Sequence, residues 1–253
     1  MPDAGLRKLL AGSNIWIIGL DGCGKDKIGE DLAKSLGYRF VNTNEIISQL
    51  VKAPVDDALI EQVGEEQWRQ IERSVLDQVQ AYVRTVVTTG SMAPLDTENW
   101  AKFRTGVVVY THAEGSTLRE EGVQGPASNE AAAMMEGLGT HERLPLLLAQ
   151  RETLYRQADI TVVVDDGDAP PAARDKISEA LRAFIEENPA LDKPKLSEGH
   201  AQALSRIMDL KDDEKDRRPA GADVPREQIN KLNKMLDEVE GTEGGPEAPG
   251  NKK

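Results

Sequence analysis

A glycine-rich stretch near the N-terminus has the residue types and spacing of a phosphate-binding loop. Residues 19–26 read GLDGCGKD and follow the pattern Gly-x4-Gly-Lys. Glycines let the backbone wrap around a phosphate, so that several N–H groups converge on its oxygens, and the positive end of the following helix adds attraction. The lysine of such a loop reaches the β- and γ-phosphates of a nucleotide. The sequence therefore predicts phosphate or nucleotide binding by Gly19, Gly22, Cys23, Gly24, Lys25 and Asp26.

The residue that follows the lysine departs from a working loop of this type. That position normally holds Ser or Thr, whose hydroxyl ligates Mg²⁺, and here it holds Asp26. A carboxylate is favourable at a helix N-terminus, but it repels the phosphates of a nucleotide. Two interpretations stay open: Asp26 caps the helix, or it impairs nucleotide binding. Because a carboxylate can also bind Mg²⁺, we expect ATP and Mg²⁺ as weakened ligands, and no cofactor is certain.

The segments around this loop alternate between strand and helix patterns. Short β-branched apolar runs predict strands at 14–20, 38–41, 85–89, 105–111 and 160–164. Apolar residues spaced three or four apart, together with capping residues, predict helices at 26–36, 45–51, 55–63, 67–84, 99–104, 146–157 and 171–187. Strands that alternate with helices are typical of an α/β fold, in which helices cover both faces of a parallel sheet.

Several motifs in this order resemble the shikimate kinase family. Residues 19–47 read GLDGCGKDKIGEDLAKSLGYRFVNTNEII, where the family has GLxGxGKSTxGxxLAxxLGxxFxDTDxxI. The similarity continues in residues 64–72, 86–94, 144–147 and 151–158, so that it covers residues 14–187 in order. The resemblance implies a three-layer P-loop kinase fold of the nucleoside-monophosphate-kinase type. Such a fold has a central five-stranded parallel sheet, a helical substrate-binding region and a lid at about residues 113–143.

The departures from the family pattern fall on residues with chemical roles. Where the family has Asp-Thr-Asp, this chain has Asn42-Thr43-Asn44. In the family the first Asp helps to hold Mg²⁺, and the second grips the substrate hydroxyl and accepts its proton. An amide has neither the negative charge nor the basicity for these roles. The resemblance thus implies degraded metal positions at Asp26 and Asn42, and no catalytic base at Asn44.

Other positions of the family site are kept or shifted. The glycine triplet that approaches the substrate becomes Thr89-Gly90-Ser91, and the arginine before the proline in the family's RPLL motif is represented by Arg143, one residue earlier. Arg119 is a candidate lid arginine that would contact the nucleotide. The resemblance implies a substrate-like pocket formed by Asn44, Arg69, Glu72, Gly90 and Arg143.

These changes predict a shikimate-kinase-like protein that has lost the kinase reaction. Loss of a general base typically costs about 10²–10⁴ in rate, and loss of a placed Mg²⁺ removes further charge stabilisation. The main hypothesis is therefore a non-catalytic binding or regulatory module. Two alternatives stay open: an active ATP-dependent shikimate kinase that uses Asp26 as an unusual Mg²⁺ ligand, and a nucleotide sensor that binds without turnover.

Composition and charge exclude several other classes of protein. The net charge of −13 disfavours nonspecific contact with a nucleic-acid backbone. The apolar runs are far shorter than the roughly 20 residues of a membrane-spanning helix. The chain has a single cysteine, Cys23, which excludes an intramolecular disulfide and a cysteine-based zinc site. A redox role for this thiol beside a helix N-terminus is an open but minor hypothesis.

The expected domain organisation has three parts: an N-terminal extension at 1–13, the P-loop domain at 14–188, and a tail at 189–253. The tail is charged, ends in a run rich in Gly, Pro and Glu, and has no aromatic residue, so we expect it to be partly disordered with short helices. Residues 190–253 are the candidate docking segment for a protein partner. Similarity to the shikimate-kinase-like proteins of plants and algae suggests the plastid, although no targeting signal is visible, and the alternative is the cytoplasm.

Overall fold

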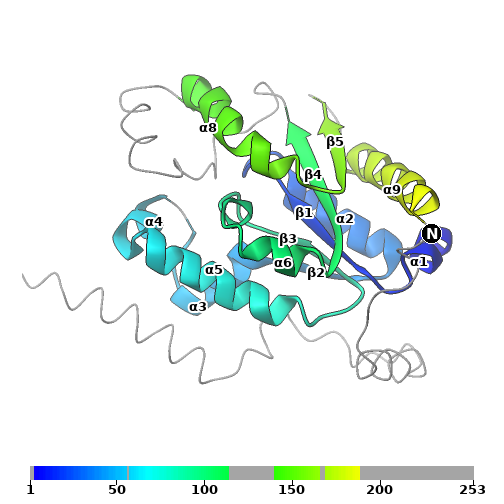
Figure 1. Ribbon diagram of the computed structural model, residues 1–253, viewed down its shortest axis with the longest axis horizontal. Helices are drawn as coiled ribbons and strands as arrows, with labels where there is room; N and C mark the ends of the chain where they lie inside the picture. The colour runs from blue at the N-terminus through cyan, green and yellow to red at the C-terminus, as the bar shows by residue number, and fades with distance from the viewer. Residues whose placement is uncertain (1–2, 56, 114–139, 166–168, 189–253) are drawn as a thin grey trace, which may run out of the picture.

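The computed structural model describes residues 3–55, 57–113, 140–165 and 169–188. Within these ranges strands and helices alternate along the chain, as the sequence pattern predicted (Figure 1). The elements are α1 (Ala4–Leu10), β1 (Asn14–Ile18), α2 (Lys25–Leu36), β2 (Arg39–Asn42), α3 (Thr43–Val51), α4 (Asp57–Val63), α5 (Glu65–Val79), β3 (Thr85–Thr88), the 3₁₀ turn η1 (Ala93–Leu95), α6 (Asn99–Phe103), β4 (Gly106–Ala113), α8 (Thr140–Tyr155), β5 (Ile160–Val164) and α9 (Pro170–Glu187).

The five strands form one parallel sheet in the order β2-β3-β1-β4-β5. β1 therefore lies at the centre, paired with β3 through Ile15 and Val86 and with β4 through Ile15 and Val107. The strand order reverses direction on the two sides of β1. In open α/β sheets, ligands bind beyond the carboxyl ends of the strands at such a switch point, and the glycine-rich loop follows β1 there.

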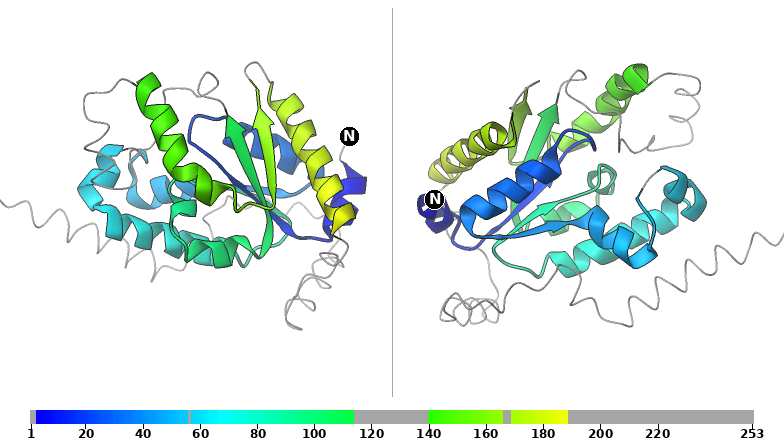
Figure 2. Two further views of the ribbon diagram at one scale, coloured as in Figure 1. Left: turned by 45° about the horizontal axis from the view of Figure 1, so that its top comes forward. Right: turned by 180° about the vertical axis from the view of Figure 1, so that it is seen from behind.

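Alternate residues of the central strand belong to two apolar cores, one on each face of the sheet. Trp16 and Ile18 pack with residues of α3, α5 and α6. Ile15 and Ile17 pack with residues of α1, α2 and α9. This alternation follows from the two-residue period of a strand, and the two helical layers are visible on opposite faces of the sheet in Figure 2. The three-layer α/β fold with a five-stranded parallel sheet is confirmed.

Residues 3–13 of the expected N-terminal extension contain α1, which packs on α9 and α2. Leu6 and Leu10 of α1 are buried in the core beneath α9. Asp3 caps α1 by accepting a hydrogen bond from the Leu6 backbone N–H at 3.0 Å, and it also pairs with Arg182 of α9. These contacts place α1 in the same packed unit as the sheet.

Two helix boundaries differ from the sequence prediction by five or more residues. α5 ends at Val79 instead of residue 84, because the chain must turn back to enter β3, and it does so through Arg84 at a positive φ of 55°. α8 begins at Thr140, six residues before the predicted start, and contains Pro145. The predicted lid lies at 113–143: its residues 114–139 are outside the described part of the chain, as is the whole predicted tail from 189 to 253. Among the described helices, none is long and apolar enough to cross a membrane.

Candidate functional site

The glycine-rich loop connects the carboxyl end of β1 to the start of α2, where the sequence placed it. Gly24 is the N-cap of α2 and has a φ of 78°, in the left-handed region that favours glycine. Gly19, with a φ of 153°, lies so close to β4 that an added Cβ would come within 2.7 Å of the Thr111 carbonyl oxygen. The loop therefore depends on glycine at both positions: at Gly24 for the left-handed backbone and at Gly19 for the close approach to β4.

The side chain of the loop lysine is buried and forms an ion pair within the protein. Lys25 is the first residue of α2 and is 3% exposed, and its Nζ forms an ion pair with the carboxylate of Asp21. Burial alone would lower the pKa of Lys25, but the carboxylates of Asp21 and Asp26 outweigh it and raise the pKa, so the ammonium group remains charged. The sequence pattern did not predict a role for Asp21, because it lies in the loop before α2, where helical spacing does not apply.

The second oxygen of Asp21 joins the loop to the segment after β3. Asp21 Oδ2 accepts a hydrogen bond from the Ser91 backbone N–H at 3.2 Å. Ser91 is held in turn from α8, because Arg151 donates to its Oγ at 3.0 Å and the Tyr155 hydroxyl donates to its carbonyl oxygen at 2.6 Å. Arg151 and Tyr155 are buried and lie one helical turn apart. A single buried polar network therefore connects the loop, the segment after β3 and α8.

The two predicted metal positions lie on different elements and offer a poor donor set for Mg²⁺. Asp26 lies exposed in the first turn of α2. Asn42 ends β2 and caps α3: its Oδ1 accepts hydrogen bonds from the backbone N–H groups of Asn44 at 2.9 Å and Glu45 at 3.3 Å. The amide oxygen of Asn42 is thus committed to the helix N-terminus.

Asn44 and Glu72, two residues of the expected substrate-like pocket, meet at Gly90. A Cβ added to Gly90 would lie 2.6 Å from Asn44 Oδ1 and 3.2 Å from Glu72 Oε1, so both side chains reach the same point. The Asn44 Oδ1 and Glu72 Oε2 atoms are buried and have no hydrogen-bond partner among the described residues. Burial, assisted by the carboxylates of Asp21 and Asp96, raises the pKa of Glu72 to about 8 against the opposing charge of Arg69. At neutral pH this cluster is therefore mostly uncharged.

Arg69 lies on the same helix as Glu72 but forms its ion pair at the surface. Its guanidinium contacts Glu65 Oε1 at 2.5 Å, one turn earlier on α5, and the side chain is 32% exposed. Arg69 is therefore paired with Glu65, and it acts on Glu72 through its charge, which opposes the rise in the pKa of that carboxyl. Of the other expected arginines, Arg119 lies outside the described residues, and Arg143 lies on α8.

Cys23 lies inside the loop and is shielded from solvent. It is 5% exposed, and its Sγ is 3.4 Å from Thr111 Oγ1 on β4. Burial raises the pKa of the Cys23 thiol, although the charge of Lys25 acts in the opposite direction. A buried thiol with a raised pKa is a weak nucleophile. These properties argue against the minor redox hypothesis.

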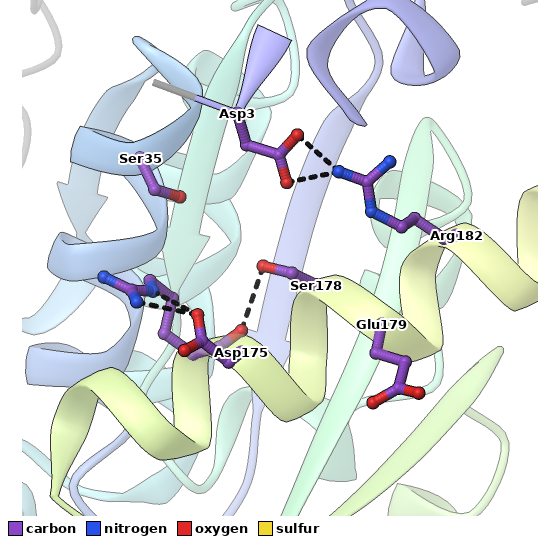
Figure 3. Close-up of a pocket in the computed structure, with 7 residues that line it drawn as sticks. Asp3, Ser35, Asp175, Ser178, Glu179 and Arg182 are labelled. Atoms are coloured by element: carbon purple, nitrogen blue, oxygen red, sulfur yellow. Dashed lines mark hydrogen bonds and ion pairs between the residues drawn. The ribbon is translucent and has the colours of Figure 1, made fainter. Parts of the chain in front are cut away.

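A separate hollow of about 560 Å³ opens between α1, α2 and α9 (Figure 3). It lies near Ser35, at the opposite end of α2 from Lys25. Four of its charged groups are paired with one another: Asp3 contacts Arg182, and Arg174 contacts Asp175. Because these pairs satisfy each other and lie a helix length from the loop, the hollow is not part of the candidate site.

The residues at the loop do not fit a Mg²⁺–nucleotide complex. The lysine is occupied by Asp21, the position of the metal-ligating hydroxyl holds a carboxylate, and Asn42 caps a helix. Within the described ranges, no group of three or more His, Cys, Asp or Glu side chains could hold a metal ion.

Comparison with known proteins agrees with the fold and with the loop. The shikimate kinase family model matches residues 21–185. Shikimate kinase from Thermosynechococcus vestitus is 33% identical over 180 residues, which are 71% of this chain and 96% of that protein. Shikimate kinase from Gloeobacter violaceus is 35% identical over 182 residues, covering 72% and 99%.

The comparison of structures gives the same result. Shikimate kinase from Acinetobacter baumannii, solved in complex with shikimate, superposes with a TM-score of 0.58 at 25% identity. The superposition covers 72% of this chain and 98% of that one. The matched sequence and the superposed structure extend over nearly the whole length of these relatives. The chain therefore belongs to the shikimate kinase family.

Proposed function

We propose that this chain is a member of the shikimate kinase family that no longer transfers a phosphoryl group and acts as a binding or regulatory module. The observation that carries the proposal is Asn44. It lies beside Glu72 and Gly90, where the family resemblance places the acid that accepts the substrate proton, and its Oδ1 is buried. An amide cannot act as a general base.

The charge of the neighbouring groups supports the same proposal. Glu72, with a pKa of about 8, holds its proton at neutral pH and is a poor substitute for an ionised carboxylate. Asn42 and Asp26 stand where the family has its Mg²⁺ ligands, so the charge stabilisation that the metal supplies is weakened as well. Loss of a base alone costs about 10²–10⁴ in rate, and the combined losses leave little turnover.

The alternative is an active shikimate kinase in which the exposed Asp26 carboxylate ligates Mg²⁺. Its support is that relatives with 31–35% identity are named shikimate kinases. A coupled ADP-release assay with shikimate, ATP and Mg²⁺ separates the two proposals, with the Thermosynechococcus vestitus relative assayed in parallel. We expect no shikimate-dependent release above background. A turnover of about 1 s⁻¹ or more, which is within the usual range for enzymes, would overturn the proposal.

The partner and the compartment are further parts of this proposal. We propose that a protein partner binds through residues 190–253, because an intact scaffold with an altered site needs another mode of action. Pull-down with the full chain against a chain ending at residue 188 tests this, and equal recovery of every partner would contradict it.

We also propose a plastid location, which similarity to cyanobacterial relatives supports. Imaging of a fluorescent fusion distinguishes the plastid from the cytoplasm.

A further inference from the structure

The phosphate loop of this chain contains its own anion. The Asp21 carboxylate is 6% exposed and contacts two groups from different elements: the Nζ of Lys25 and, at 3.2 Å, the backbone N–H of Ser91. An ammonium group and a backbone N–H are also the donors that a phosphate-binding loop offers to phosphate oxygens. We propose that Asp21 is a built-in anion that occupies the phosphate loop and excludes polyphosphate ligands.

The carboxylate is held in place by more than the ion pair. Ser91, which donates to it, is itself fixed by Arg151 and by the Tyr155 hydroxyl of α8. Releasing Asp21 would therefore leave both a buried ammonium group and a buried backbone N–H without this partner. The loop is therefore more stable when Asp21 pairs with Lys25, and the state in which Lys25 is available to a ligand is a minor population. When the competent state is a small fraction of the population, the apparent affinity for a ligand falls by that fraction.

Electrostatic repulsion weakens polyphosphate binding as well, in addition to the competition of Asp21 for Lys25. Asp21 neutralises the ammonium charge of Lys25 at contact distance, and Asp26 places a second carboxylate in the first turn of α2. A polyphosphate that approached the helix N-terminus would meet two negative side chains in a partly buried site, where repulsion is stronger than in water. The inference deepens the proposed function and rests on it, because a working kinase would have to admit ATP.

Calorimetric titration with ATP and with inorganic pyrophosphate, both without Mg²⁺, tests this inference directly. The full-length chain carries Asp26→Ser throughout the series, so that the second acid does not mask the effect. We expect Asp21→Asn in this background to bind both ligands at least about tenfold tighter than Asp26→Ser alone, since one unit charge at contact is removed. Adding Lys25→Ala should abolish the gain. Asp31→Asn, the same change on the helix that follows the loop but outside the ion pair, should leave affinity unchanged.

Equal affinity of the Asp26→Ser protein with and without Asp21→Asn would overturn the inference. The unmodified chain gives a second test that does not depend on a variant folding. If it binds ATP and loses that binding with Lys25→Ala, the lysine is available and the inference is wrong; if it shows no binding that depends on Lys25, the inference is supported. ATP binding that depends on Lys25 but occurs without turnover would overturn this inference alone, whereas shikimate-dependent turnover would overturn the proposed function too.

Discussion

The protonated state of Glu72 makes stability depend on pH in a direction that can be measured. Folding raises the pKa of this side chain from its ordinary value of 4.5 to about 8, chiefly through burial. Between these values the folded protein keeps a proton that the unfolded chain has lost. The unfolded state therefore binds fewer protons, and stability decreases as pH rises. The contribution of Glu72 is fully present below pH 4.5 and is lost as the pH rises toward 8 and beyond.

The size of the effect follows from the pKa shift. In this range a single shifted group changes the free energy of unfolding by about 1.36 kcal/mol per pH unit. From pH 6 to pH 8 the wild-type protein should therefore lose about 2 kcal/mol through Glu72, since the slope lessens near the folded pKa. Glu72→Gln keeps the shape of the side chain but cannot ionise, so the variant should not show this loss.

Urea unfolding at pH 6, 7 and 8 measures the effect, followed by the fluorescence of the three buried tryptophans, of which Trp68 lies one turn before Glu72 on α5. The stability of Glu72→Gln relative to wild type should increase by about 2 kcal/mol between pH 6 and pH 8. Glu66→Gln, the same change at an exposed position of α5, is the matched control and should parallel wild type. Parallel profiles for Glu72→Gln and wild type would refute the argument.

Two further predictions concern buried groups outside this cluster. Cys23 should react with a thiol reagent such as DTNB much more slowly in the native protein than in urea, because it is buried and its pKa is raised; fast labelling of the native chain would contradict this. Asn14→Ala should destabilise the protein by about 2 kcal/mol in urea unfolding, because the buried Thr85 N–H and the Tyr82 carbonyl lose their partners. A change as small as that of Asn188→Ala, made at an exposed site, would show that water replaces these bonds.

The arrangement of helices and strands was predictable because the signals for it are local. The apolar run at 14–18 and the glycines at 19, 22 and 24 predicted a strand, a loop and a helix, and these elements are present with small shifts at their ends. Boundaries such as the end of α5 were less predictable, because they depend on where the chain must turn to reach the next strand. Similarity to the shikimate kinase family then gave the layers of the fold.

The sequence by itself determined which chemical groups are present: a loop lysine, an acid at position 26, and amides at 42 and 44. Only the tertiary structure decided what these groups contact. Asp21 reaches Ser91 across 70 residues of sequence, and Asn44 and Glu72 approach Gly90 from α3 and α5. Such contacts depend on how strands and helices pack. In that packing the carboxylates of Asp21 and Asp26 keep Lys25 charged, and burial keeps Glu72 protonated at neutral pH. The spacing of residues in the sequence shows neither these contacts nor these charge states.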